Sequence, residues 1–298
     1  MKAAAARRMN NDRTLIVVPT YNERENVARL VAELFEVAPR ADVCLVDDAS
    51  PDGTADHAEE SYGADPRFFV LRRAGARGYG RSLVDGYRRA LEGGYARLVQ
   101  LDADFSHDPR RIPALVEASL RGADVVIGSR YCAGGGVENW PLRRRLLSRF
   151  ANAYVARITG LRVRDATSGF RCYTRRAMRV LLAGRVAGEG YAFLVEATYR
   201  AARAGLALTE VPITFTDRRV GQSKMSRKVI LESVVMPWRL RLAGEKGGGG
   251  MSSAIRPASS GAAPIWKSAS SGSAISSRTN SFNDIPVVRR TSSPIRKP

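Results

Sequence analysis

Two aspartates separated by one residue follow directly on an apolar run in the first half of the chain. The run, residues 96–101, has the composition of a short buried strand, and Asp102 and Asp104 come straight after it. Side chains two residues apart at a strand end can converge on one cation, and hard divalent cations take oxygen ligands. The pair therefore predicts a metal site that could neutralise phosphate groups. A helix cap or a solvated loop is the alternative, because Asp108-Pro109 resembles a helix start.

Three further groups of polar residues occur at the ends of predicted strands. Residues 19–23 (PTYNE) follow the first strand, and residues 47–54 (DDASPDGT) follow the second with a strong turn signal. Residues 128–130 (GSR) close the fifth strand with an arginine, whose planar guanidinium suits phosphate. Taken singly, Asp48 could be a turn residue and Arg130 a surface ion-pair partner. Ligands of open α/β sheets bind beyond the carboxyl ends of the strands, so we expect these groups to lie together.

The elements that must position these groups alternate between strand and helix patterns. The predicted strands are residues 14–19, 43–47, 68–71, 98–101 and 125–128, and the predicted helices between them are residues 22–37, 55–62, 82–91 and 112–121. This order is typical of a mostly parallel, doubly wound α/β sheet. The second half predicts helices at 142–158, 175–183, 192–204 and 226–242, with a strand at 208–215. Pro212 interrupts that strand, and Pro237 is expected to kink or terminate the last helix.

The predicted helix at residues 142–158 is basic and amphipathic. Leucine and aromatic residues recur on one side, and four arginines lie mostly elsewhere on its surface. One interpretation is a helix packed on the core with a solvated arginine face. The other is an interfacial helix that brings the protein to anionic lipid.

Composition limits the classes of partner and of cofactor. The chain has 298 residues and a formal net charge of +19, which favours an anionic partner or reflects a compositional bias. A nucleic-acid partner is disfavoured because no nucleic-acid-binding motif occurs and the acidic strand ends would repel a phosphate backbone. The three cysteines are widely spaced, which argues against a disulfide framework and a zinc site. No apolar run of about 18 residues occurs, so we expect no spanning helix and a cytoplasmic protein.

The chain divides by composition into three parts. Residues 1–12 are expected to be a flexible terminus, and residues 13–243 to form one domain. Residues 244–298 are rich in Gly, Ser and Pro and are expected to be a disordered basic tail.

Together these motifs resemble the family 2 glycosyltransferases of the GT-A fold. More narrowly, they resemble the polyprenol-phosphate (dolichyl-phosphate) mannosyltransferases that have no membrane spans. The resemblance covers about residues 13–242 and is carried by residues 19–26, 47–54, 102–104, 128–131, 167–171 and 211–215. Residues 190–193 (GYAF) and the segment 218–225, with Arg218 and Gly221 to Met225, narrow it towards polyprenol-phosphate acceptors.

The resemblance implies a role for each matching position. A nucleotide-sugar pocket would include Pro19, Tyr21, Glu23, Val46 and Asp48. The diphosphate and a Mg²⁺ or Mn²⁺ ion would be held by Asp102, Ala103 and Asp104, with a weaker metal role for Ser106, where some members have Gln. The phosphates of donor and acceptor would be surrounded by Arg130, Arg218 and Lys224, which with Asp104 form the implied catalytic set. Weak acceptor-side positions are Ser168 and Gly169.

The activity implied is inverting transfer of mannose from GDP-mannose to polyprenyl phosphate, giving polyprenyl β-mannosyl phosphate and GDP. The alternatives are another sugar donated by a UDP-sugar, a noncatalytic relative that keeps the fold, and a basic nucleic-acid-binding protein. A phosphate monoester is already anionic near neutral pH, so the acceptor needs no strong base, and His107 is expected to shape its loop. The expected partner is an anionic membrane surface at its cytoplasmic face, without nucleic acid, and the sequence leaves open whether a separate membrane-anchoring protein recruits the chain.

Overall fold

The computed structural model describes residues 12–184, 190–217 and 227–246. The predicted site residues Arg218 and Lys224 lie outside the described residues, as do almost all of the predicted flexible terminus and tail. The last helix, α9 (Arg227–Lys246), runs three residues past the predicted domain boundary at 243. It also continues through Pro237, which therefore does not terminate it.

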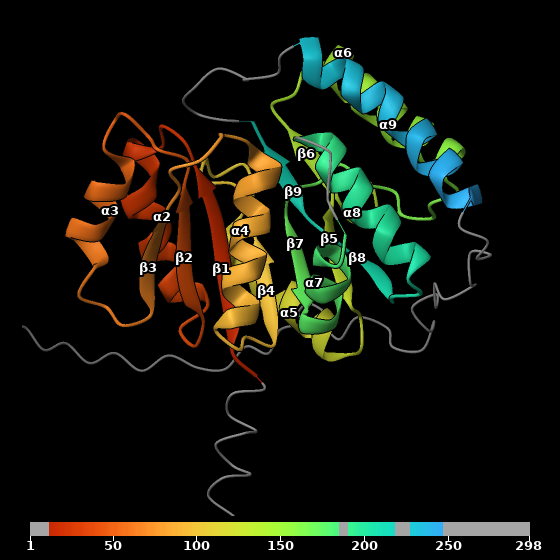
Figure 1. Ribbon diagram of the computed structural model, residues 1–298. Coiled ribbons are helices and arrows are strands. Elements are labelled where there is room, and N and C mark those ends of the chain that lie inside the picture. The colour runs from red at the N-terminus through yellow and green to blue at the C-terminus, as the bar shows by residue number, and fades with distance from the viewer. Residues whose placement is uncertain (1–11, 185–189, 218–226, 247–298) are drawn as a thin grey trace, which may run out of the picture. The chain divides into compact units, whose positions relative to one another are not determined.

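A seven-stranded sheet forms the centre of the described domain (Figure 1). Its strands lie in the order β3-β2-β1-β4-β7-β5-β8, and all pairs are parallel except those made by β7, which is antiparallel to both neighbours. The bounds are β1 Thr14–Thr20, β2 Asp42–Asp47, β3 Phe68–Arg72, β4 Arg97–Gln100, β5 Val125–Ser129, β7 Arg171–Thr174 and β8 Leu208–Pro212. The expected mostly parallel sheet is confirmed. A second sheet pairs β6 (Gly136–Glu138) with β9 (Thr214–Thr216), so the strand predicted at 208–215 is two strands that meet near Pro212.

Helices cover both faces of the sheet because successive strand residues point to opposite sides. On one face Leu15 and Val17 pack with α4, α7 and α8, and on the other Ile16 and Val18 pack with α2 and α5. The helix bounds are α2 Arg24–Val37, α3 Thr54–Tyr62, α4 Tyr79–Glu92, α5 Ile112–Leu120, α6 Leu142–Thr159, α7 Arg175–Leu182 and α8 Tyr191–Arg203. These bounds confirm the predicted helices within a few residues.

The helix α6 does not pack on the core over its first turns. Leu147 and Phe150 are each 68% exposed, and Leu142 and Leu146 are also exposed, whereas Val155 and Ile158 near its end are buried. The core-packed interpretation of this helix is therefore wrong for its amino-terminal half. One flank of α6 contacts α9: the hydroxyl of Tyr154 on α6 donates to the backbone carbonyl of Val234 on α9 at 2.8 Å. None of the described helices is both long enough and apolar enough to cross a bilayer.

Candidate active site

The four polar groups predicted from the sequence meet at one edge of the sheet. Strands β2, β1 and β4 are parallel, and β5 runs in the same direction because β7 is antiparallel to both β4 and β5. Their carboxyl ends therefore open on the same side, where ligands of α/β sheets bind. The prediction that these groups share one edge is confirmed.

The loop after β2 is fixed by hydrogen bonds to its two aspartates. Asp47 accepts from the hydroxyl of Thr20 at 2.9 Å and from the backbone and hydroxyl of Ser50 at 2.9 and 2.6 Å. Asp48 forms a buried ion pair with Arg73 and accepts from the backbone N–H of Gly78 at 2.7 Å. Asp48 is thus held in place before any ligand arrives. Arg73 was not predicted as a site residue, because nothing in its local sequence marks it as the partner of a carboxylate 25 residues earlier.

The remaining residues predicted for the nucleotide end take different positions. The guanidinium of Arg77 lies 4.5 Å from the centre of the Tyr21 ring and donates to its hydroxyl at 2.6 Å. Glu23 accepts from the side chain of Asn26 at 2.8 Å, at the start of α2. Pro19 is half-buried in β1, and the side chain of Val46 is fully buried in the core. Val46 could therefore meet a ligand only through backbone atoms.

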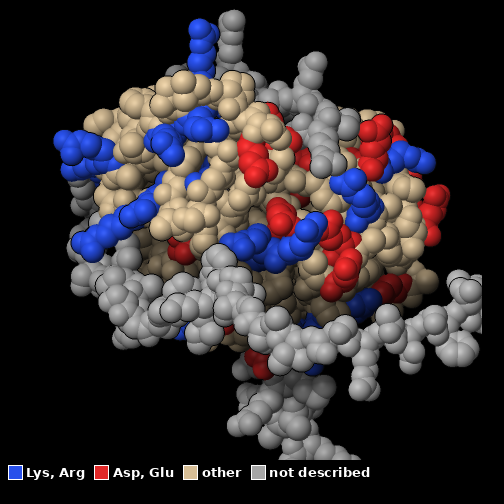
Figure 2. All heavy atoms as spheres, turned by 180° about the vertical axis from the view of Figure 1, so that it is seen from behind, with Lys and Arg blue, Asp and Glu red and all other residues tan. Residues whose placement is uncertain are grey.

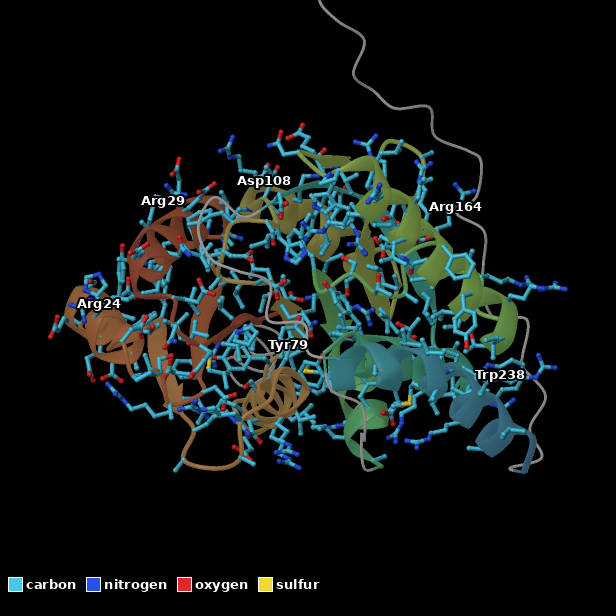
Figure 3. All side chains as sticks on the ribbon, turned by 90° about the horizontal axis from the view of Figure 1, so that it is seen from above. Arg24, Arg29, Tyr79, Asp108, Arg164 and Trp238 are labelled. Atoms are coloured by element: carbon cyan, nitrogen blue, oxygen red, sulfur yellow. The ribbon has the colours of Figure 1, made fainter. Side chains whose placement is uncertain are left out.

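Asp102 lies at the end of β4 against α4 and the loop before β7. The hydroxyl of Tyr79, a residue labelled in Figure 3, donates to Asp102 Oδ1 at 3.1 Å. A Cβ on Gly169 would lie 2.7 Å from that hydroxyl and 3.5 Å from both carboxylate oxygens, so only glycine fits there without displacement. The predicted acceptor-side residue Gly169 thus packs on the predicted metal residue Asp102. Its neighbour Ser168 is buried and lines the same pocket.

Asp104 is buried and its carboxylate is oriented by Ser106. The backbone N–H and the hydroxyl of Ser106 both reach Asp104 Oδ1, at 3.1 and 2.6 Å. The Ser106 hydroxyl donates in this arrangement and positions Asp104 as a ligand. Ala103, between the two aspartates, has its side chain in the core. Phe105 takes a positive φ of 58°, which turns the loop sharply after Asp104.

The donor set fits a hard divalent cation. Asp102 and Asp104 offer carboxylate oxygens, and Tyr79 and Ser106 hold those carboxylates by hydrogen bonds, as second-layer partners of metal ligands do. The described residues contain no cluster of three or more His, Cys, Asp and Glu side chains. A cation held here would thus need further oxygen ligands, which the phosphates of a substrate supply.

His107 is part of the wall of this loop. Its Nδ1 accepts from the backbone N–H of Asp102 at 3.3 Å, and its ring lies between Phe170 and Phe215. Burial lowers the pKa of His107 below its ordinary value, although the nearby Asp102 and Asp104 oppose that shift. The imidazole is therefore neutral, and its Nδ1 lone pair already accepts a hydrogen bond, so His107 has no free lone pair with which to take up a proton. It holds the loop, as the sequence predicted.

A pocket of about 220 Å³ opens beside Asp102. It is lined by Asp102, His107, Arg130, Arg144, Thr167, Ser168, Gly169, Tyr191, Phe215 and Asp217. Arg130 directly follows β5, Arg144 lies on α6, residues 167–169 form the loop before β7, and Phe215 lies on β9, so both halves of the domain form the pocket.

Arg130 is buried in the wall of this pocket by a bidentate ion pair. Its Nε and Nη2 donate to Asp165 at 2.7 and 2.6 Å, and Nη2 also donates to Thr167 at 2.7 Å. Burial alone would raise the pKa of Asp165, but the Arg130 guanidinium holds it below its usual range. Asp165 was missed in the sequence because its partner lies 35 residues earlier.

Arg144 is the second arginine of the pocket. It donates to Asp217 at 2.7 Å, and its guanidinium lies 4.2 Å from the centre of the Trp140 ring. The sequence indicated Arg144 only as one of the surface arginines of the basic helix. Its position at the amino-terminal turn of α6 places it at the junction of the pocket and the exposed apolar side of that helix.

Comparisons with known proteins give consistent findings. The profile described as Glycosyl transferase family 2 matches residues 15–182. The polyprenol monophosphomannose synthase of Mycolicibacterium smegmatis is 43% identical over 232 residues, covering 77% of this chain and 88% of that protein. The undecaprenyl-phosphate mannosyltransferase of Micrococcus luteus is 42% identical over 231 residues, covering 78% and 95%.

The fold is similar to that of a solved enzyme with lower identity. Glucosyl-3-phosphoglycerate synthase from Mycobacterium tuberculosis, crystallised with Mn²⁺, uridine diphosphate and phosphoglyceric acid, superposes with a TM-score of 0.58. The identity is 20%, and the match covers 79% of this chain and 80% of that one. At this identity the likeness bears on the fold alone, and it agrees with the expected GT-A fold.

Proposed function

The chain belongs to glycosyl transferase family 2, and we propose that it transfers mannose from GDP-mannose to a polyprenyl phosphate. The assignment of the acceptor and the sugar rests on the identity of 42–43% to a polyprenol monophosphomannose synthase and an undecaprenyl-phosphate mannosyltransferase. The chain covers 88% and 95% of their lengths. The products would be polyprenyl β-mannosyl phosphate and GDP, formed with inversion.

The geometry of the site supports this chemistry. The acceptor phosphate is an anion and attacks the anomeric carbon without a base, which agrees with the engaged and neutral His107. The residues would therefore align two phosphates and stabilise the departing diphosphate. Asp102 and Asp104 would hold Mg²⁺ or Mn²⁺, which when bound neutralises charge on the leaving group. The M. tuberculosis relative binds Mn²⁺ with a nucleoside diphosphate.

The acceptor side of the pocket is assigned to Arg144 and the loop with Ser168 and Gly169. Arg144 stands where the catalytic pocket meets the exposed apolar side of α6, and a polyprenyl phosphate has the same two parts, a charged head and an apolar chain. Arg218 and Lys224, outside the described residues, are proposed to add cations at the phosphates. The exposed side of α6 would rest on an anionic membrane surface at its cytoplasmic face, with or without an anchoring protein.

The test is transfer by purified protein in detergent micelles. Polyprenyl phosphate is supplied with radiolabelled GDP-mannose or UDP-glucose, and the label is followed into the organic extract. Label from GDP-mannose that depends on polyprenyl phosphate is expected. Label from UDP-glucose alone would assign the donor to the UDP-sugars, which the uridine diphosphate bound to the structural relative makes the second candidate.

A further inference from the structure

A second pocket, of about 410 Å³, opens on the flank of α6 that faces away from α9. Figure 3 shows Arg164 on that flank, with α9 and Trp238 on the other. The helix contributes Arg149, Asn152 and Ala156, and the segment after it contributes apolar Leu161 and Val163. The pocket thus has an apolar floor and a charged rim.

The rim carries positive charge that no carboxylate neutralises. Arg149, Arg162 and Arg164 line the pocket, and no Asp or Glu does. Within the described ranges none of the three forms an ion pair, in contrast to Arg130 and Arg144 of the catalytic pocket. The carboxylate of Glu210 on β8 accepts from the backbone N–H groups of residues 164 and 165 and forms no ion pair with the three arginines. The pocket is therefore suited to an anion.

Two buried polar atoms in the pocket lack a hydrogen-bond partner. Asn152 is only 5% exposed, and its Nδ2 donates to the carbonyl of Ser148 and to Thr167 Oγ1 at 3.0 and 3.1 Å. Its Oδ1 is unpartnered, as is the buried hydroxyl of Tyr131. Leaving a buried acceptor unpaired is unfavourable, so a ligand that also carries a hydroxyl would satisfy it. The ligand that fits has an anionic group and a hydroxyl.

The pocket adjoins the exposed apolar side of α6. Leu142, Leu146, Leu147 and Phe150 are all more than half exposed, and the exposed Arg143 and Arg157 lie among them. On the face shown in Figure 2, basic side chains lie among uncharged surface on the side of α6, and most acidic ones gather on the other side. An apolar surface edged with cations is complementary to the interface of an anionic bilayer.

We propose that this pocket binds the headgroup of an anionic phospholipid that carries a free hydroxyl, such as phosphatidylglycerol. The proposal rests on the proposed function in that the same side of α6 meets the membrane. The lipid phosphate lies among Arg149, Arg162 and Arg164, and a headgroup hydroxyl donates to Asn152 Oδ1. Thr167 lines the catalytic pocket and accepts from Asn152, so a single hydrogen bond separates the two pockets.

The experiment measures binding of the full chain to vesicles of phosphatidylcholine with and without 30% phosphatidylglycerol. The variant R162Q/R164Q removes two exposed charges of the rim. At about 1 kcal/mol for each basic residue at an anionic surface, it should bind the mixed vesicles roughly thirtyfold more weakly. The matched control R88Q/R121Q removes two exposed arginines on α4 and at the end of α5 and should bind within about twofold of wild type.

A substitution that changes no charge separates binding in the pocket from general electrostatic attraction to the vesicle. Ala156→Phe fills the pocket and should remove most of the preference for phosphatidylglycerol over phosphatidic acid, which has no headgroup hydroxyl. Equal weakening in the two double variants, or no such preference in wild type, would overturn the proposal. Displacement of the protein from vesicles by millimolar inorganic phosphate, which carries no alcohol hydroxyl, would instead assign the pocket to a free anion and overturn the membrane source.

Transfer in detergent keeps the two proposals distinguishable. R162Q/R164Q and Ala156→Phe should retain the wild-type rate in micelles, because neither touches the catalytic pocket. Loss of transfer by wild type with intact selective vesicle binding would contradict the proposed function and support the lipid pocket. If wild type transfers mannose but binds vesicles with no preference for phosphatidylglycerol, the proposed function would be supported and the lipid pocket contradicted.

Discussion

Tyr79→Phe should weaken the apparent affinity of the enzyme for its divalent cation while leaving the fold intact. The change deletes one hydroxyl, whose hydrogen bond to Asp102 Oδ1 measures 3.1 Å. Burial, together with the charge of Asp102, raises the pKa of Tyr79 well above its ordinary value, so this hydroxyl is a neutral donor throughout the working pH range. A hydrogen bond to a charged group contributes about 1.5–3 kcal/mol.

If half or more of that energy orients Asp102 toward the cation, the effect is about tenfold. The expected result is a rise of about tenfold in the Mn²⁺ concentration that gives half-maximal transfer, as found for outer partners of metal ligands. The matched control is Tyr87→Phe, because Tyr87 lies on the same helix and is buried, but its hydroxyl donates to Gln100. The control should lose some thermal stability and keep the wild-type Mn²⁺ dependence.

Gly169→Ala tests the same contact from the other side. Its new Cβ would lie 2.7 Å from the Tyr79 hydroxyl, so the variant should lose activity in the wild-type background and less in the Tyr79→Phe background. An unchanged Mn²⁺ dependence in Tyr79→Phe would refute the claim that Tyr79 positions a metal ligand. Equal losses for Gly169→Ala in both backgrounds would show that its cost arises elsewhere.

Three further outcomes are expected. Asp104→Ala should nearly abolish transfer while the purified variant stays folded, and EDTA should stop wild-type transfer until Mg²⁺ or Mn²⁺ is added; full activity in EDTA would remove the metal from the mechanism. Asp165→Asn should lower the free energy of unfolding by about 3 kcal/mol in denaturant titrations near pH 7, since it leaves Arg130 buried without its counter-ion. Because the folded pKa of Asp165 is depressed, this difference should be present above about pH 4 and shrink as the pH falls through the folded pKa. Burial raises the pKa of Cys44 and Cys172 to about 12, so iodoacetamide should label them at pH 8 only after unfolding, as mass spectrometry would show.

The part of the fold that could be predicted from the sequence is the part with local signals. The strands and helices of residues 14–129 have apolar periodicities that do not depend on distant residues, and parallel order places their polar ends together. Strand β7 could not be predicted in this way. Its four residues include a buried arginine, Arg171, whose guanidinium donates to the carbonyls of Ala166 and Ser168. Only the folded loop supplies those acceptors.

The sequence marked candidate site residues, but it did not mark the partners that hold them. Arg73 and Asp165 hold Asp48 and Arg130 through ion pairs between residues far apart in the sequence, which no short motif records. The amphipathic spacing of α6 likewise predicted an apolar side of the helix, but not whether that side faces the core or the solvent. That direction depends on which neighbours pack against the helix, and in the structure they bury Val155 and Ile158 but leave Leu142, Leu146, Leu147 and Phe150 exposed.

Electrostatics links the two pockets and argues for a cation in the catalytic one. Among the described residues that line it, Arg130 and Arg144 are each paired with a carboxylate, Asp102 adds a further negative charge, and burial keeps His107 neutral. Despite a chain charge of +19, this lining has no excess of positive charge to attract a nucleoside diphosphate. Its arginines supply oriented N–H donors, and a divalent ion at Asp102, as proposed above, would supply the neutralising charge. The three arginines of the second pocket, which form no ion pair with the described residues, lie instead beside the apolar side of α6, where an anionic surface rather than a soluble donor can reach them.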